Sequence, residues 1–316
     1  MINKTIHLGP MPLPLGGISI YLYRLSKMNT DKHTMFINEI LLNKKGFLKL
    51  LFSGKDNLFI YHSPSLYRRV LLYMMSLFTT NKYVIVSHGQ GLENSYNKSN
   101  FFVKLVIKKM IFKAEYIQIV GKHLEQFLLD IGYNENKIII KNAFLEPPLE
   151  DENKILATYE RELIDFIDSH DKIIIANASY LVFHNNVDLY GLDMCIELTS
   201  KLKKDYPNIG FVFALANEKA NVIYLEQMKK RIKDLEIEDN FYFITGQKEL
   251  WPLFKKADLM IRPTLSDGYG ISIAEALYFD CPAIASDVSD RPEGTTIFKN
   301  RDLEDLYNKS IIILND

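Results

Sequence analysis

The strongest constraint on the fold of this chain is a glycine-containing turn between two short apolar runs near its carboxyl end. Residues 258–261 and 281–287 are short apolar runs of the kind that form buried strands. Between them, Gly268 and Gly270 precede a stretch that is predicted to be helical. Glycine lets a backbone approach a ligand closely, and the free N–H groups at a helix N-terminus favour an anion such as phosphate. The segment therefore predicts a strand, an anion-binding turn and a helix.

Two acidic residues accompany this turn. Asp267 stands directly before the first glycine, and Glu275 falls on the second turn of the expected helix. Carboxylates on both sides of a phosphate-binding turn are well placed to hold the hydroxyls of a sugar and of a ribose. An ordinary strand–helix turn with a capping Asp and a surface Glu explains the same residues. The motif alone leaves both interpretations open.

The rest of the chain repeats the strand–helix unit in two successive sets. This alternation predicts two doubly wound parallel sheets, with ligands at the carboxyl ends of the strands. The first set has expected strands at 4–9, 34–41, 57–62, 82–88, 116–120 and 137–142, and helices at 18–26, 46–53, 65–80, 101–113 and 121–131. The second has strands at 171–176, 209–214, 241–245, 258–261, 281–287 and 295–298, and helices at 153–169, 190–207, 220–236, 247–256 and from 302.

Residues 146–152, rich in proline and acidic side chains, are the best domain boundary. We expect an N-terminal domain at 1–145, a linker with its own helix at 146–170, and a C-terminal domain at 171–316.

The turn motif resembles the signature of the family 4 glycosyltransferases, which have the GT-B architecture. That signature is an acidic residue, seven residues and then Glu, with Gly-aromatic-Gly between them. Here Asp267, Gly268-Tyr269-Gly270 and Glu275 fill these places, with Asp where the family usually has Glu. The resemblance implies two Rossmann-like domains facing across a cleft, the first on the acceptor side and the second binding a nucleotide sugar.

The resemblance also implies roles for individual residues. Asp267 would hold sugar hydroxyls, Glu275 would hold the ribose, and His88, at the end of a strand in the first half, would line the acceptor side. These are the expected catalytic residues. The expected donor-binding residues are Gly16, Gly17, Arg262, Gly268, Tyr269, Gly270, Ile271 and Arg291.

Two cations that the family normally uses to grip the donor diphosphate are missing. Asn177 and its neighbours stand where the family has Arg, and Tyr190 stands where it has Lys before a glycine. Each charge-assisted contact of this kind contributes about 1.5–3 kcal/mol. Arg262 and Arg291, each followed by proline, are the candidates to replace them. The alternative for each arginine is a surface ion pair.

The function that the resemblance implies is retaining, front-face transfer of a hexosyl or N-acetylhexosaminyl group from a UDP-sugar. The acceptor would be a lipid-linked glycan in bacterial capsule, O-antigen or exopolysaccharide synthesis. No cofactor is expected, and no metal, since metal-binding spacings such as H-x-x-x-H and C-x-x-C are absent. A non-catalytic glycan- or nucleotide-binding subunit is an alternative because the two cations are missing. A GT-B sugar-nucleotide epimerase needs acid and base carboxylates in the first half, where only eight acidic residues occur.

Charge is distributed unevenly along the chain. Residues 1–145 carry 19 basic and 8 acidic side chains, a net charge of +11, while the whole chain has a net charge of −1. The basic half either binds an anionic partner or complements the acidic second half. The basic helix at 101–113 is therefore either a membrane-surface helix or an ordinary cover for the sheet. We expect a cytoplasmic protein, at the inner face of the membrane in the first case, with no nucleic-acid partner.

Overall fold

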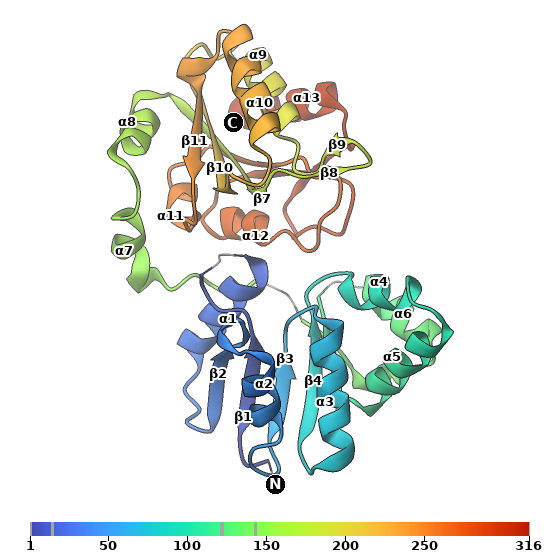
Figure 1. Cartoon of the computed structure of the whole chain (residues 1–316). Helices are drawn as coiled ribbons and strands as arrows, with labels where there is room; N and C mark the ends of the chain where they lie inside the picture. The colour runs from blue at the N-terminus through green and yellow to red at the C-terminus, as the bar shows by residue number, and fades with distance from the viewer. Residues whose placement is uncertain (1, 14–15, 121–122, 142–143, 316) are drawn as a thin grey trace. The chain divides into compact units, whose positions relative to one another are not determined.

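The computed structural model describes residues 2–13, 16–120, 123–141 and 144–315. The chain divides into two compact units, Met1–Leu145 and Glu146–Asp316, and each is described by itself. Each unit is built on one six-stranded parallel sheet with helices packed on it (Figure 1). The predicted α/β class with two doubly wound parallel sheets is confirmed.

The first sheet has the strand order β2-β1-β3-β4-β5-β6, so the chain winds away from β1 in both directions. The strands β1 and β3 are neighbours, and between them lies the switch point at which α/β proteins place ligands. The elements are β1 (Thr5–Gly9), α1 (Gly17–Met28), β2 (Thr34–Asn38), η1 (Glu39–Leu41), α2 (Lys44–Leu51), β3 (Leu58–Tyr61), α3 (Leu66–Phe78), β4 (Lys82–Ser87), α4 (Gly91–Asn97), α5 (Phe101–Lys113), β5 (Ile117–Ile119), α6 (His123–Asp130), η2 (Glu135–Lys137) and β6 (Ile138–Ile140).

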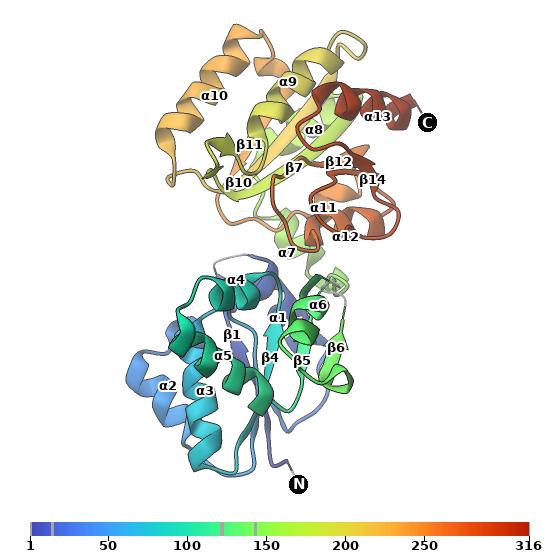
Figure 2. The ribbon, with the colours of Figure 1, turned by 90° about the vertical axis from the view of Figure 1, so that its right-hand side faces the viewer.

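The second sheet has the order β11-β10-β7-β12-β13-β14, with its switch point between β7 and β12 (Figure 2). The elements are η3 (Leu149–Asp151), α7 (Glu152–Leu156), α8 (Arg161–Ser169), β7 (Lys172–Tyr180), β8 (Phe183–His184), β9 (Val187–Asp188), α9 (Leu192–Leu202), β10 (Ile209–Asn217), α10 (Val222–Asp234), η4 (Glu238–Asn240), β11 (Phe241–Thr245), α11 (Trp251–Phe254), β12 (Leu259–Arg262), α12 (Ile271–Tyr278), β13 (Ala283–Ser286), β14 (Thr296–Phe298) and α13 (Leu303–Asn315).

The central strand β7 is an unbroken apolar run in the sequence because both of its faces are buried. Ile173 and Ile175 belong to one buried cluster, while Ile174 and Ala176 belong to another. Successive side chains of a strand point to opposite faces, so this strand contributes to a core on both sides. A parallel sheet covered on both faces requires this pattern.

The helix predicted at 153–169 is wrong in one respect, because the structure breaks it into α7 and α8. The break falls at residues 157–160, where the Thr158 hydroxyl bonds to the carbonyl of Ile155. The Tyr159 hydroxyl donates to the Glu249 carbonyl at 2.7 Å, so this residue is anchored on the loop before α11. A tertiary contact thus overrides the helical pattern of the segment.

Other local differences involve short elements. The strand expected at 34–41 ends at Asn38, whose side chain accepts a hydrogen bond from the Ile40 N–H and begins η1 instead. The helix expected at 247–256 contracts to α11, and the expected helix at 121–131 is described from His123 onward. Two short elements, α4 and the β8–β9 hairpin, were not predicted from the sequence.

The glycine directly before α9 provides a test of the close backbone packing in the second unit. Gly191 has φ +72°, and an added Cβ would lie 2.6 Å from the carbonyl oxygen of Pro263. We expect Gly191→Ala to destabilise this unit by about 2–4 kcal/mol, because left-handed strain and a backbone clash add together. Urea unfolding followed through Trp251, the chain's one tryptophan, reports on this unit.

Gly246 supplies the matched control. It also has a positive φ of +86°, but an added Cβ meets nothing within 4 Å. Gly246→Ala should therefore show only the conformational strain, about 1 kcal/mol. Equal losses in the two variants would contradict the role assigned to the Pro263 contact.

Candidate active site

The carboxyl edge of the second sheet brings together the predicted donor-binding residues of this unit. The strand β12 pairs with β7 as far as Met260, opposite Ile175, and then continues to Arg262. The Arg262 guanidinium reaches back across the switch point and donates to the Asn177 side chain at 3.1 Å. The site is therefore built where the order of the strands reverses, as the fold predicts.

Asp267 is held between two arginines. Its carboxylate accepts two hydrogen bonds from Arg262, from Nε at 2.6 Å and from Nη2 at 3.1 Å. A third comes from Arg291 Nη1 at 2.7 Å, and a fourth from the Gly268 N–H at 3.0 Å. The side chains of Arg262 and Asp267 are both 12% exposed, and that of Arg291 is 2% exposed. These are buried, hydrogen-bonded ion pairs, so neither arginine forms the surface ion pair that was the alternative.

Arg291 is fixed by the strand beside it as well as by Asp267. Its Nε donates to the carbonyl of Ser286 at 3.0 Å, and Nη2 donates to the Ser286 hydroxyl at 3.0 Å and to Thr264 Oγ1 at 3.3 Å. Both hydroxyl partners are fully buried. A guanidinium with this many fixed partners has one orientation, which is the geometry needed for an anion-binding group.

The cluster carries a net positive charge. Burial alone raises the pKa of Asp267, but attraction to Arg262 and Arg291 outweighs it and holds that pKa well below its usual range. Arginine stays protonated in proteins. Two cations and one anion therefore leave a charge of about +1 at the start of α12. The helix macrodipole adds positive potential at the same place.

The glycine turn shapes the start of α12. Gly270 has φ +79°, and a Cβ there would lie 2.8 Å from Ile273 Cδ1 and 3.4 Å from Arg291 Nη1. Ile271 begins the helix, and its first N–H groups lack the usual partner four residues earlier; the N–H of Ile273 donates to the Gly270 carbonyl at 3.0 Å. The Ser289 hydroxyl donates to the Gly268 carbonyl at 3.0 Å, which fixes the turn from the other side.

The other two predicted residues of this motif lie on the same element or next to it. Glu275 is on the second turn of α12 and is 6% exposed. Tyr269 is half-buried, between the two glycines. The structure thus places Asp267, Glu275 and the glycine turn on one loop and one helix, in the order that the sequence predicted.

Four residues of the cluster were not predicted as site residues. Asn177 holds Arg262, and Tyr190 places its ring centroid 5.7 Å from the Arg262 guanidinium carbon. Thr264 and Ser286 hold Arg291. Asn177 and Tyr190 stand at the positions where the two cations of the resembled family are missing. Their function could be inferred only from their partners, which are 72–85 residues away in the sequence.

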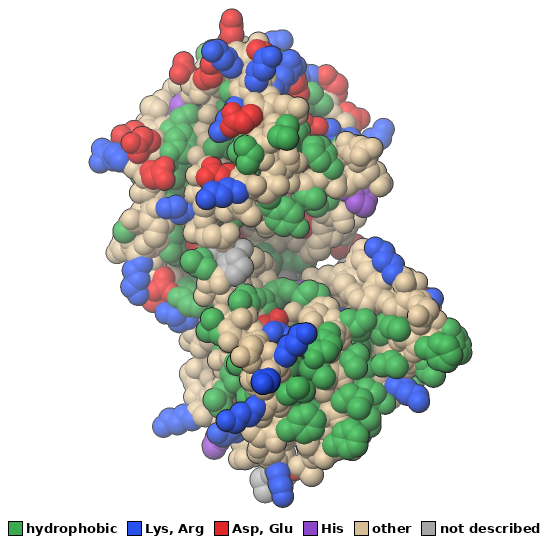
Figure 3. All heavy atoms as spheres, in the orientation of Figure 1, with side chains coloured by type: hydrophobic (Ala, Val, Ile, Leu, Met, Phe, Trp, Pro, Cys, Tyr) green, Lys and Arg blue, Asp and Glu red, His purple; other side chains and the backbone are tan. Residues whose placement is uncertain are grey.

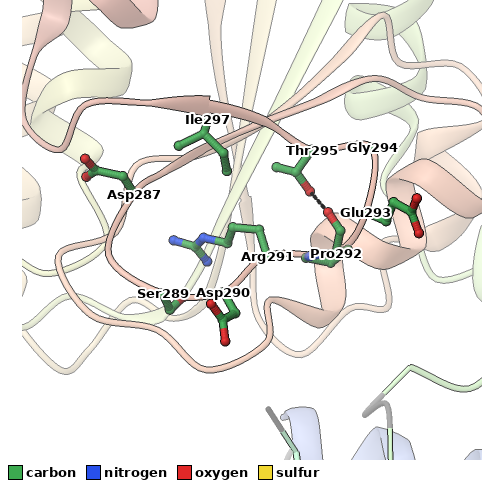
Figure 4. Close-up of a pocket in the computed structure, with 9 residues that line it drawn as sticks. All are labelled: Asp287, Ser289, Asp290, Arg291, Pro292, Glu293, Gly294, Thr295 and Ile297. Carbon is green, nitrogen blue, oxygen red and sulfur yellow. Dashed lines mark hydrogen bonds between the residues drawn. The ribbon is translucent and has the colours of Figure 1, made fainter. Parts of the chain in front are cut away.

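A hollow of about 430 Å³ lies on the loop after β13 (Figure 4). Arg291 lines it, but so do Asp287, Asp290 and Glu293. Three acidic side chains disfavour a diphosphate. The anion-binding features of this unit are therefore at the turn before α12 and not in this hollow.

In the first unit, three histidines from neighbouring strands form a chain. His7 Nδ1 lies 3.0 Å from His62 Nε2, and His62 Nδ1 lies 3.2 Å from His88 Nε2. His7 is in β1, and the other two directly follow β3 and β4. The ring of Tyr21 packs against His88 at a centroid distance of 4.9 Å. His88 thus lies at the carboxyl edge of the sheet, as predicted, together with two histidines that the site prediction did not include.

The three imidazole rings are linked by hydrogen bonds, so the position of the N–H proton on one ring determines its position on the other two. Burial lowers the pKa of His7 and of His88 to about 4, and the pKa of His62 is also well below its ordinary value because of burial. A neutral imidazole has one donor and one acceptor, so both hydrogen bonds run in the same direction along the chain. Within the described residues, His88 Nδ1 is buried without a hydrogen-bond partner at the end of this chain. Switching all three tautomers would move a proton from one end to the other.

The glycine pair of the first unit lies at the start of α1. Gly16 has an extended backbone and donates its N–H to Ser19 Oγ at 2.9 Å. An added Cβ at Gly16 would meet nothing within 4 Å, so no contact in the described part of the unit explains a glycine here. Gly17 is the first residue of the helix and is exposed. Across the described ranges, no three His, Cys, Asp or Glu side chains are placed to hold a metal ion.

The Asp267 bridge generates a stability prediction. Asp267→Asn removes the anion while two buried cations remain, and breaking a buried pair in this way costs about 3–5 kcal/mol. The Trp251 unfolding transition should move to lower urea concentration by a corresponding amount. Asp165→Asn is the control, because its ion pair with Arg161 is exposed and is worth less than about 1 kcal/mol. Equal effects would contradict a buried bridge.

The histidine chain predicts acid sensitivity confined to the first unit. The pKa values of His7 and His88 are about 4 in the folded state against 6.5 ordinarily, so the unfolded state binds more protons between these values. The stabilisation is complete above about pH 6.5 and is lost as pH falls toward about 4, by roughly 1.4 kcal/mol for each pKa unit. Hydrogen exchange should show protection falling in β1, β3 and β4 over this range. Replacing His62 by Gln should weaken this pH dependence, because the lowered pKa of His62 then no longer contributes, and an unchanged profile would contradict the assignment.

Comparison with known proteins finds similarity both in sequence and in fold. Residues 168–307, most of the second unit, match the family model of the glycosyl transferases group 1. No curated protein sequence matches the chain. Among solved structures, the Anabaena protein HepE in complex with UDP has a TM-score of 0.72 at 13% identity, over 99% of this chain and 90% of that chain.

Two further structures show the same fold. A glycosyltransferase from Rickettsia africae has a TM-score of 0.70 at 17% identity, covering 99% of this chain and 88% of that chain. Sucrose-phosphate synthase from Thermosynechococcus elongatus has a TM-score of 0.66 at 12% identity, covering 99% and 90%. These likenesses show the fold, which is GT-B. Residues 168–307 therefore resemble the group 1 glycosyl transferases, within a chain whose two units have the GT-B fold.

Proposed function

We propose that this protein is a retaining glycosyltransferase that moves a hexosyl or N-acetylhexosaminyl group from a UDP-sugar to a glycan acceptor. The observation that carries the proposal is the Arg262–Asp267–Arg291 cluster at the start of α12. It supplies one net positive charge beside a helix N-terminus, in a unit that matches the group 1 family. HepE has been solved with UDP and with UDP-glucose, which supports a uridine nucleotide as the donor.

The cluster has the properties needed to stabilise a leaving diphosphate. Negative charge develops on the leaving group as the glycosidic bond breaks, and fixed donors aimed at that charge lower the barrier. Arg262 and the N–H groups of Gly270 and Ile271 are our candidates for these donors. Arg291 acts through Asp267 and the adjacent serine and threonine, because its side chain is only 2% exposed against 12% for Arg262. In this proposal the two arginines take over the task of the missing family cations.

Asp267 has a different task here from the one that the family resemblance implies. Its two oxygens accept four hydrogen bonds from the protein. We therefore assign it to positioning Arg262, with contact to the sugar as a secondary role. Glu275 remains the candidate for the ribose hydroxyls, and Tyr269 lies between the glycines that approach the donor. Metal-independent transfer fits a site in which arginines supply the positive charge.

On the acceptor side, His88 is the candidate to contact the attacking hydroxyl. It ends a chain of three neutral histidines and retains a buried Nδ1 without a partner among the described residues. Gly16 and Gly17 at the start of α1 are candidates to approach the donor phosphate, since no described contact explains the first of them. The acceptor we propose is a lipid-linked glycan in bacterial capsule, O-antigen or exopolysaccharide synthesis, at the inner face of the membrane.

The epimerase alternative has little support in the first unit. The one carboxylate buried there in the described ranges, Glu39, accepts from Arg68 at 2.6 Å and from the Tyr61 hydroxyl at 2.9 Å. A carboxylate occupied in this way is a poor general acid or base. A non-catalytic binding subunit differs from an enzyme only in turnover, so a turnover measurement separates the two.

Donor binding tests the proposal through Arg262. Arg262→Gln removes a charge-assisted contact worth about 1.5–3 kcal/mol, and every 1.4 kcal/mol is about tenfold in affinity. We expect UDP to bind at least about tenfold more weakly by calorimetry. Arg161→Gln is the control, because that arginine is in the same unit and its side chain is 83% exposed. Unchanged UDP affinity in Arg262→Gln would remove the basis for the proposed donor site.

Release of UDP from UDP-glucose then separates an enzyme from a binder. We expect the wild-type protein to release UDP faster than Glu275→Ala does. Equal release from both proteins, with UDP binding retained, would favour the binding subunit.

A further inference from the structure

The first unit has a large apolar surface that its core does not use. The helices α3 and α5 pack side by side, and hydrophobic side chains gather over them (Figure 3). Phe78, Phe101 and Phe102 are 72%, 75% and 77% exposed. We call this surface the α3–α5 face; its exposed apolar residues are Tyr67, Met74, Leu77 and Phe78 of α3 and Phe101, Phe102, Val103, Leu105, Val106 and Phe112 of α5.

Packing of α5 on the sheet does not explain why these apolar side chains are exposed. Ile107, Met110 and Ile111 already form the buried side of α5. A helix that only covers a sheet has a polar outer side, whereas the outer side of α5 alternates apolar residues and lysines. Soluble monomers rarely expose a contiguous apolar patch larger than a few hundred Å². The simple covering helix that the sequence left open as an alternative therefore does not account for the α3–α5 face.

The charged side chains of α3 and α5 are all basic. Neither α3 nor α5 contains an acidic residue, and α5 contains Lys104, Lys108, Lys109 and Lys113. Lys104 and Lys108 lie against the rings of Tyr96 and Phe112, while Lys109 and Lys113 are exposed. The rest of the unit agrees, with a net charge of +11 over residues 1–145. An apolar surface bordered by lysines fits a partner that is apolar inside and anionic outside.

A second copy of the chain fits this face less well. A symmetric dimer brings the same patch of both subunits together. The lysines of two α5 helices would then face each other with no acidic residue on either face, and like charges repel. A bilayer with anionic headgroups satisfies both parts of the surface, because aromatic and aliphatic side chains enter the interface and lysines meet the headgroups.

We propose that the α3–α5 face docks the protein on the surface of an anionic lipid bilayer. No helix in the described part of the chain is long and apolar enough to cross a membrane, so the docking is peripheral. The inference adds a specific surface to the lipid-linked acceptor of the proposed function. It can fail separately, because vesicle binding is measured without donor or acceptor.

Flotation of the full chain with vesicles tests the proposal. Vesicles of equal parts phosphatidylglycerol and phosphatidylcholine should carry the wild-type protein upward at low salt, and pure phosphatidylcholine should carry much less. High salt should release it, because surface charge is screened. Phe101→Ser with Phe102→Ser, and separately Lys109→Gln with Lys113→Gln, should each reduce the bound fraction about tenfold or more. The substituted side chains are exposed, so thermal unfolding should not change.

The control carries equivalent changes on α10 in the second unit. Ile223 is 77% exposed, and Lys230 and Lys233 are exposed on the same helix. Ile223→Ser with Lys230→Gln and Lys233→Gln should float like the wild type. The proposal is overturned if the wild type stays in the soluble fraction at low salt, or if the α5 variants float unchanged. It is also overturned if the phenylalanine variants abolish a concentration-dependent dimer while lipid binding is absent.

Discussion

The second unit depends on one buried carboxylate. Asp267 joins the end of β12 to the loop after β13 through Arg262 and Arg291. Without that anion, two guanidinium groups would be buried at one edge of a sheet without compensation. With it, both arginines have fixed orientations and the cluster retains a net positive charge. The stability of this edge and its capacity to bind an anion therefore come from the same interaction.

The two units use different polar groups at the switch points of their sheets. Each has a polar contact across the switch point of its sheet, Asn177 with Arg262 in one and His7 with His62 in the other. The first contact positions a permanent cation. The second positions neutral rings that can pass a proton. In the proposed function, the diphosphate of the donor requires the cation, and the hydroxyl of the acceptor requires a group that takes up a proton.

The fold was predictable because its main determinants are local. Apolar runs such as 258–261, with glycine turns between strands and helices, indicated all twelve strands of the two parallel sheets among the described residues. The break between α7 and α8 was not predictable, because it depends on Tyr159 meeting a carbonyl 90 residues away in sequence. The short β8–β9 hairpin has too few residues for a period to be visible.

The site was predictable as a set of positions but not as a set of bonds. The spacing of Asp267, the glycines and Glu275 identified the turn, and the two Arg-Pro pairs identified the cations. Residue spacing did not indicate that both arginines would bind the same aspartate, nor that His62 would connect His7 to His88. Such partners depend on how the strands are ordered in the sheet, which residue spacing alone does not specify.

The bidentate contact between Arg262 and Asp267 also bears on how chains of this type diverge. Glutamate in place of Asp267 adds a methylene group, so both arginines would have to shift to keep their bonds. Losing Arg262 would remove two of the four hydrogen bonds to Asp267, and losing Arg291 would remove one. Positions 262, 267 and 291 should therefore change together, and a chain with the longer acid would need a differently arranged pair of cations.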